Sequence, residues 1–249
     1  PADTIITFRT DKTWSLSVDE LPEWLNLEKV GQNQLKVSIP TPNTALFERS
    51  AMIKFMVQGT EEVFEFPFKV VQPAPYIISA NADISSDPAT GYSKILFTRG
   101  EMFRSDYTIS KGRFIIEFND MKMSSICNLG FVFLGTTTDA NFKFHMEGSY
   151  TYWFRCAGAF TWIAPIKKTY TFDEVNAIRK LEFVIDDSAS GEGLIDISIY
   201  INGALYGTQA GRTDAFANGE EGCVFILDTS LDPTAGDGCT IKSITYISK

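Results

Sequence analysis

Aromatic and polar side chains alternate on either side of Gly148-Ser149, and their chemistry suits sugar binding. A two-residue turn that begins with Gly favours a type II′ β-hairpin, in which Glu147 would pair with Tyr150 and His145 with Tyr152. An aromatic ring can pack on the C–H face of a sugar, while fixed polar groups bind its hydroxyls. We therefore predict a carbohydrate-binding face at this hairpin.

Trp162 is predicted as a second aromatic platform of the same surface. The opposite face of the hairpin is predicted to be core; it carries Phe142, Phe144, Met146, Thr151 and Trp153. Two alternatives stay open. The polar face could be a half-solvated strand pair with ordinary cross-strand aromatics, and Trp162 could be a core residue.

Catalytic patterns are absent from the sequence, so we predict no catalytic residues and no enzyme activity. His145 is the one histidine, no Ser lies in G-x-S-x-G, and no phosphate-binding glycine loop occurs. Glycoside hydrolysis needs only two carboxylates. The sandwich-fold glucanases carry theirs as Glu-x-Asp-x-x-Glu or Glu-x-Asp-x-Glu on one strand. The nearest candidate here, Asp196, has no Glu two residues to either side.

The four cysteines have no C-x-x-C spacing, so no zinc site is predicted. They are either small buried hydrophobic residues or form a disulfide. The best pairing is Cys223–Cys239, because the residues between them, including Asp232-Pro233, resemble a returning loop. The other two cysteines are Cys127 and Cys156.

Calcium is a possible cofactor, although no metal site is assigned. Asp186-Asp187 and the group Asp228, Asp232 and Asp237 could supply oxygen ligands at loops between strands. Neither set matches the EF-hand pattern, and acidic turns also occur without metal.

The overall charge and hydropathy exclude several partners. Lys and Arg total 22 against 31 Asp and Glu, which gives a net charge of −9. Nucleic acid and acidic membranes would be repelled. No apolar run reaches the roughly 18 residues of a membrane span. The sequence starts Pro1-Ala2-Asp3 without a signal segment, so we expect a trimmed chain whose lost part could hold an export signal or lipid anchor.

Two β-rich domains are predicted, residues 1–73 and 76–249, separated by the prolines of Val70–Pro75. Period-2 alternation such as Phe64, Phe66 and Phe68 dominates the first, and Pro67 marks an edge strand or bulge. We expect six or seven short strands there and a larger antiparallel sandwich after the break.

Three local patterns predict elements of the second domain. Asn202-Gly203 between alternating strands favours a type I′ hairpin that pairs Ile201 with Ala204 and Ile199 with Tyr206. Thr171 and Glu174 have capping-box spacing, which predicts a two-turn helix. The apolar run Gly130–Gly135 predicts a strand covered on both faces.

The first domain resembles the BACON family, small immunoglobulin-like modules of Bacteroidetes surface and secreted proteins. The matching residues are Trp14, Trp24-Leu25, Asn43, Arg49 and the closing Val71-Gln72-Pro73. The stretch Asn26–Gly31 departs from the family's Ser/Gly-rich pattern. The resemblance implies a spacer or a carbohydrate-binding module, with both Trp side chains in the core.

The second domain resembles a concanavalin A-like, laminin-G-type jelly roll. The matching segments are Leu181–Asp186, Ile197–Gly207 and Ile241–Tyr246. Such domains bind glycans or proteins, or hydrolyse glycans, so the resemblance supports a fold more than a function.

Together these patterns predict an all-β, exported or surface-anchored protein that binds a polysaccharide or other glycan without catalysis. In this prediction the first domain acts as a spacer for the second. A protein-binding adhesin or assembly module is the first alternative, and an unrecognised glycoside hydrolase is the second.

Overall fold

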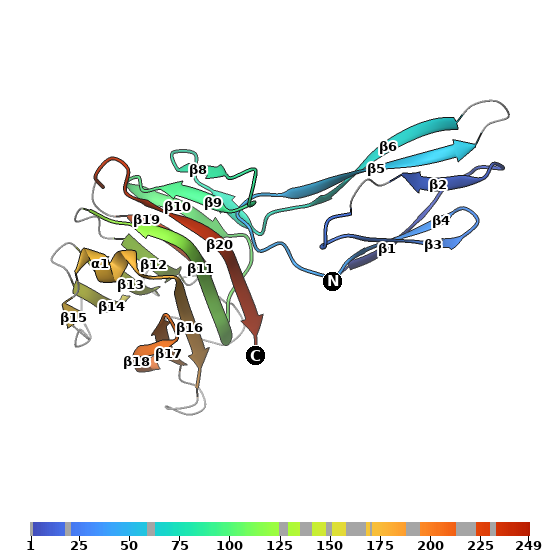
Figure 1. Ribbon diagram of the computed structural model, residues 1–249. Coiled ribbons are helices and arrows are strands. Elements are labelled where there is room, and N and C mark those ends of the chain that lie inside the picture. The colour runs from blue at the N-terminus through green and yellow to red at the C-terminus, as the bar shows by residue number, and fades with distance from the viewer. Residues whose placement is uncertain are drawn as a thin grey trace. The chain divides into compact units, whose positions relative to one another are not determined.

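The chain folds into two β-rich units in the computed structural model (Figure 1). The first unit contains residues 1–43 and 48–74, and the second contains 44–47 and 75–249. The structure describes residues 2–17, 21–58, 63–124, 129–134, 141–147, 151–157, 168–169, 171–187, 195–212, 223–229 and 233–249. Only the backbone is described at 2, 63, 134, 141, 143, 145, 147, 151–157, 168–169 and 209–212.

The first unit is a small sandwich of two antiparallel three-stranded sheets, in the orders β1-β4-β3 and β2-β5-β6. Its strands are β1 (Ala2–Thr7), β2 (Trp14–Ser17), β3 (Asn26–Gly31), β4 (Gln34–Ile39), β5 (Arg49–Gln58) and β6 (Val63–Gln72). Trp14 and Trp24 lie in its core, as predicted, with 3% and 9% of their surface exposed. The Arg49 guanidinium lies 4.9 Å from the centre of the Trp24 ring, a cation–π contact that helps to fix this core.

Pro67 lies on β6, which is an edge strand, as predicted. The backbone N–H of Gln58 donates to Thr13 on the β2 side of β5. Hydrogen-bonding direction alternates along a strand, so Lys54 also bonds toward β2. Pro67 is paired with Lys54, and its nitrogen is therefore directed at the open edge. It costs the β5–β6 ladder no hydrogen bond.

The second unit is a larger sandwich of two seven-stranded antiparallel sheets (Figure 1). One has the order β15-β14-β13-β12-β19-β10-β7 and the other β18-β17-β16-β11-β20-β9-β8. The elements are β7 (Tyr76–Ile78), β8 (Asp83–Ser86), β9 (Ser93–Leu96), β10 (Gly100–Ser105), β11 (Gly112–Lys122), β12 (Leu129–Leu134), β13 (Asn141–Glu147), β14 (Thr151–Ala157), β15 (Lys168–Thr169), α1 (Phe172–Asn176), β16 (Lys180–Asp186), β17 (Ile195–Ile201), β18 (Ala204–Arg212), β19 (Val224–Thr229) and β20 (Gly238–Ser248). The predicted all-β fold class is confirmed.

Phenylalanine rings from both sheets fill the core between them. Phe133 on β12 lies edge-on to Phe183 on β16, with ring centres 5.1 Å apart, and Phe114 on β11 lies 4.4 Å from Phe225 on β19. All four rings are fully buried. Burying aromatic area of this size is the main favourable term in the stability of the unit.

The Asn202-Gly203 pattern in the second unit gave the correct turn but an incorrect register beyond it. Asn202 and Gly203 both have positive φ, at 50° and 83°, and Ile201 pairs with Ala204 as predicted. A register shift between Ile199 and Tyr200 pairs Ile199 with Gly207, so the predicted pairing of Ile199 with Tyr206 is wrong. One strand accommodates an extra residue at this bulge.

Helix α1 has the predicted capping box between Thr171 and Glu174 but is only five residues long. The β12 strand also agrees with its prediction, because Phe131, Val132 and Phe133 are all buried. Within the described part of the chain, no helix is long and apolar enough to cross a membrane.

The predicted Cys223–Cys239 disulfide does not form. Both thiols are free and buried. Cys223 forms an isolated backbone β-bridge with Ile109, whereas Cys239 on β20 pairs with Met121 and Ile95. The two cysteines therefore belong to different strand pairs. Burial raises the pKa of both thiols, which keeps them protonated and unreactive. Cys127 lies outside the described residues, and only the backbone of Cys156 is described.

The segment 44–47 belongs to the second unit, although the sequence around it belongs to the first. Leu46 is 1% exposed within the core of the second unit. Its N–H donates to the hydroxyl of Ser93, and Ile244 donates to the carbonyl of Thr44. The later boundary, after Ala74, lies one residue beyond the predicted Pro73.

Candidate functional site

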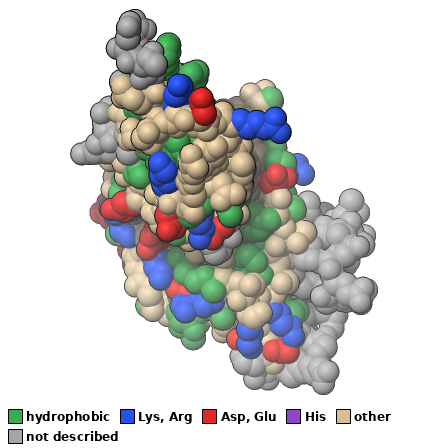
Figure 2. Space-filling model, turned by 90° about the vertical axis from the view of Figure 1, so that its right-hand side faces the viewer, with side chains coloured by type: hydrophobic (Ala, Val, Ile, Leu, Met, Phe, Trp, Pro, Cys, Tyr) green, Lys and Arg blue, Asp and Glu red, His purple; other side chains and the backbone are tan. Residues whose placement is uncertain are grey.

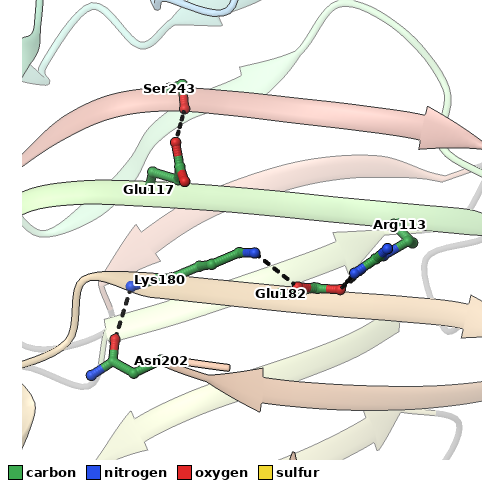
Figure 3. Close-up of polar contacts among 6 residues, drawn as sticks. All are labelled: Arg113, Glu117, Lys180, Glu182, Asn202 and Ser243. Carbon is green, nitrogen blue, oxygen red and sulfur yellow. Dashed lines mark hydrogen bonds and ion pairs between the residues drawn. The ribbon is translucent and has the colours of Figure 1, made fainter. Parts of the chain in front are cut away.

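A polar patch lies on the outer face of the sheet that contains β11, β16 and β17. Along β16, the side chains of Leu181, Phe183 and Ile185 are fully buried against the core. Because side chains alternate along a strand, Lys180 and Glu182 lie on the opposite face. We call this surface the Glu182 face; it comprises Arg113, Ile115, Lys180, Glu182, Ser198 and Tyr200 (Figure 3 shows the polar contacts around Glu182).

Glu182 is buried although it lies on an outer face, with 6% of its surface exposed. The Nε of Arg113 donates to Oε1 at 2.8 Å and its Nη2 donates to the same oxygen. The Nζ of Lys180 lies 3.1 Å from Oε2. The side chains of Arg113 and Lys180 remain 54% and 36% exposed. Two partly solvated cations therefore cover a carboxylate from which water is almost excluded (Figure 3).

Burial and ion pairing act on Glu182 in opposite directions. Burial alone would raise its pKa, but the hydrogen bonds and charges of Arg113 and Lys180 together lower the pKa below its usual value of 4.5. Glu182 is therefore ionised at neutral pH. Its charge orients the Arg113 guanidinium, whose remaining N–H groups are available to a ligand oxygen.

An aromatic ring and hydroxyl groups flank this cluster. Tyr200 on β17 is directly opposite Glu182 and is partly exposed. The neighbouring Ser198 shares a 2.7 Å hydrogen bond with Thr208 on β18. Leu205, opposite Tyr200, is 58% exposed. The face thus combines one aromatic platform, fixed polar groups and a limited apolar border.

Two further carboxylates come together on the same face of the sheet. Asp186 at the end of β16 is directly opposite Asp196 on β17, and Asp196 is 1% exposed. The sequence search for carboxylates on one strand did not find this pair, because it forms across two strands.

The structure places the predicted site residues only in part. His145 and Glu147 lie on β13 and Tyr152 lies on β14, with backbone alone described. Tyr150 and Trp162 lie outside the described residues. Glu147 pairs with Thr151 and His145 with Trp153, so the predicted pairings of Glu147 with Tyr150 and His145 with Tyr152 are wrong. Three residues, rather than two, connect the strands, and this moves every pairing by one position.

The observed register also changes which residues are cross-strand neighbours in this hairpin. Tyr152 is opposite Met146, which is fully buried. His145, Trp153, Gly130 and Asp228 form one cross-strand row instead. The grouping of Tyr152 with His145 therefore loses its geometric basis, and whether any of these residues binds a ligand stays a prediction.

The acidic residues considered for calcium have other partners where they are described. The Asp187 carboxylate lies 2.6 Å from the Lys111 ammonium, and hydrogen bonding from Lys111 lowers its pKa. Asp237 accepts hydrogen bonds from the N–H and hydroxyl of Ser124. Among residues the structure describes, no three acidic, His or Cys side chains gather as a metal site would require. Asp232 lies outside those residues, so calcium dependence stays an open prediction.

The Glu182 face was missed because its residues come from separate segments. Arg113 and Glu182 are 69 positions apart and meet only because β11 pairs with β16. A usable signal was present: polar residues at alternate positions of otherwise apolar strands, as in Lys180-Leu181-Glu182-Phe183. Comparisons of the chain with protein-family models, curated proteins and solved structures find no match.

Proposed function

We propose that the second unit binds carbohydrate at the Glu182 face, in a non-catalytic protein exported to or anchored at the cell surface, with the first unit as a spacer. The observation that carries this proposal is the buried Glu182 carboxylate, held by Arg113 and Lys180 directly beside Tyr200. A preorganised charge fixes hydrogen-bond donors without further entropic cost on binding. A tyrosine ring next to such donors suits a sugar, which has an apolar face and a polar rim.

Two other features support the choice of a glycan. The net charge of −9 argues against polyanionic partners. The exposed apolar residues near the face, Leu205 and Ile247, are separated by polar ones in the cross-strand rows. A protein-binding surface would instead favour a broad continuous apolar patch. The predicted residues His145, Glu147, Tyr150, Tyr152 and Trp162 remain the second proposed location for a sugar.

A glycan array probed with the full chain, with and without calcium, tests the proposal. We expect a set of related glycans to bind and Tyr200→Ala to weaken their binding about fivefold or more, through loss of stacking. Tyr92→Ala is the matched control, because Tyr92 is also a partly exposed tyrosine of this unit but lies before β9. An array without binding under both conditions, or equal effects of the two variants, would contradict the proposal.

Hydrolysis is the alternative that the Asp186–Asp196 pair makes worth testing, since two carboxyls suffice for it. We expect no release of reducing ends from mixed plant and host glycans. Sustained release that Asp196→Asn abolishes would overturn the non-catalytic assignment.

A further inference from the structure

In the described part of the first unit, β1 is an edge strand that pairs with β4 on one side only. The N–H of Phe8 donates to the carbonyl of Asn33, which continues the β1–β4 ladder. Since hydrogen-bonding direction alternates, the N–H and C=O groups of Asp3, Ile5 and Thr7 are directed away from β4. No described strand pairs with β1 on that side. The other outer strand that faces this side, β6, is protected by Pro67 and β1 is not.

Two aromatic side chains on the inner face of β6 are exposed next to this edge. Phe64 and Phe66 share the inward row of the β5–β6 pair with the buried Ile53, yet they are 50% and 55% exposed. A hollow of about 360 Å³ lies beside Phe66; its other lining residues are Ile6, Phe8, Arg9, Thr10, Phe55 and Val57. Figure 2 shows hydrophobic side chains reaching the surface among Lys and Arg on the side of the molecule that it draws.

The position of this hollow indicates where an added strand would lie. Phe8, which follows β1, packs on Trp14 of β2 and on Phe55 of β5, with ring centres 4.7 and 5.1 Å apart, and the hollow beside it reaches Phe66 of β6. The end of β1 therefore lies above β2 and β5, and a fourth strand added on the free side of β1 would lie above β6. Its inward side chains would cover Phe64 and Phe66. A second copy of the sandwich does not fit, because the sheet beneath its own edge strand would collide with β6.

The positively charged side chain of Arg9 lies at the hollow. Arg9 is exposed, lines the hollow, and forms no ion pair with any residue that the structure describes. An acidic side chain on the incoming segment would complement it.

We propose that the first unit captures an extended peptide strand at the β1 edge. The partner is a single segment with apolar side chains at every second position and an acidic residue opposite Arg9. Main-chain hydrogen bonds to Asp3, Ile5 and Thr7 would provide affinity, and the hollow would select the alternating side chains. The first unit is then a recognition module as well as a spacer, independently of glycan binding by the second.

A random heptapeptide display library, selected on the full chain, provides the probe. Enriched peptides should alternate apolar and polar residues and carry an acid near one end. Phe66→Lys should weaken the best peptide about tenfold or more. Met52→Lys is the matched control, because Met52 is 62% exposed on the outer face of the central strand β5, and it should change binding by less than about twofold. Melting curves of both variants check that they fold.

Amide hydrogen exchange with the best peptide bound tests the geometry directly. Exchange should slow at Asp3, Ile5 and Thr7 and stay unchanged at Thr4 and Ile6, whose N–H groups already face β4. No enriched peptide, enriched peptides without alternation, equal losses in both variants, or protection that ignores this odd-even pattern would each overturn the proposal.

Discussion

Glu182 keeps a negative charge where water has little access, and this makes part of the stability depend on pH. A lowered pKa in the folded state means that the native protein binds the proton less readily than the unfolded chain. The stabilisation is therefore complete above pH 4.5, the usual value of the group, and is lost as the pH falls through the lower folded pKa.

We predict that Glu182→Gln lowers the free energy of unfolding at pH 7 and that this difference shrinks below about pH 4.5. Urea titrations of both proteins at pH 7, 5, 4 and 3 measure it. Glu117→Gln is the control, since Glu117 is exposed on the same face and accepts a hydrogen bond from Ser243 (Figure 3). A Glu182 difference that stays constant down to pH 3 would contradict the role given to Arg113 and Lys180.

Asn202 combines two tasks in one exposed residue. It adopts a positive φ in the β17–β18 turn, while its Oδ1 accepts the N–H groups of Arg179 and Lys180 and its Nδ2 donates to Ala177. We predict that Asn202→Ala costs about 1–3 kcal/mol from backbone strain and lost hydrogen bonds. Asn202→Gly, which removes the strain alone, should recover only part of that loss in chemical denaturation. Full recovery would show that the side-chain bonds contribute nothing.

Single-residue features were predictable where their cause is local. The Asn202-Gly203 turn depends on two adjacent backbone conformations, and the Thr171 cap depends on a spacing of three. The pairing of Arg113 with Glu182 depends on the order of strands in a sheet, which no local pattern specifies. The core Trp residues were predictable because large aromatic residues are costly to expose.

The β13–β14 hairpin shows how one additional residue in a turn changes the residue pairing of two strands. Opposite residues of an antiparallel pair occupy the same face, and Tyr152 is opposite the buried Met146. The turn pattern would have set Tyr152 opposite His145 instead. One added residue in the connection therefore changes the partner of every β14 residue.

Pro67 protects the edge of the first unit without weakening its own strand pair. Pro67→Thr would add an N–H donor at the open edge and leave the β5–β6 ladder intact. We therefore predict unchanged stability but concentration-dependent self-association, measured by light scattering. Lys69→Thr, which removes a charge from the same face of β6 without adding a donor, should remain as dispersed as the wild-type chain. Loss of stability in Pro67→Thr would mean that the proline nitrogen faces β5 instead.

Strand identity was easier to predict than strand environment. Alternation correctly placed Phe64 and Phe66 with Phe68 on one row. Their exposure follows from how far the opposite sheet extends, which alternation does not determine. The register shift between Ile199 and Tyr200 and the three-residue β13–β14 connection were missed for a related reason. A glycine marks each place, Gly207 and Gly148, but a glycine does not specify how many residues a bulge or a turn contains.

The chain passes between the two units three times, after Asn43, after Phe47 and after Ala74. Only the last passage, at Pro73 and Pro75, was predicted, although a similar pair, Pro40 and Pro42, precedes the first. The short excursion 44–47 contains three apolar residues, Ala45, Leu46 and Phe47, of kinds found in any strand or loop. Its composition therefore does not indicate that Leu46 and Phe47 pack in the core of the other unit. A simple spacer joined by one linker is therefore an incomplete description of the first unit.

Leu46 provides a test of that excursion. It is 1% exposed in the core of the second unit, so Leu46→Ala should cost about 2–5 kcal/mol through lost contacts and a cavity. Residues 75–249 expressed alone should fold cooperatively but with a similar deficit, because they lack this side chain and the hydrogen bonds to Ser93 and Ile244. Residues 44–249 should recover most of it, since Thr44–Phe47 could then dock again. Urea denaturation of the three proteins gives the comparison. If the shorter fragment is as stable as the longer one, Leu46 fills no essential place in the second core; if both fragments are molten, the two units do not fold independently.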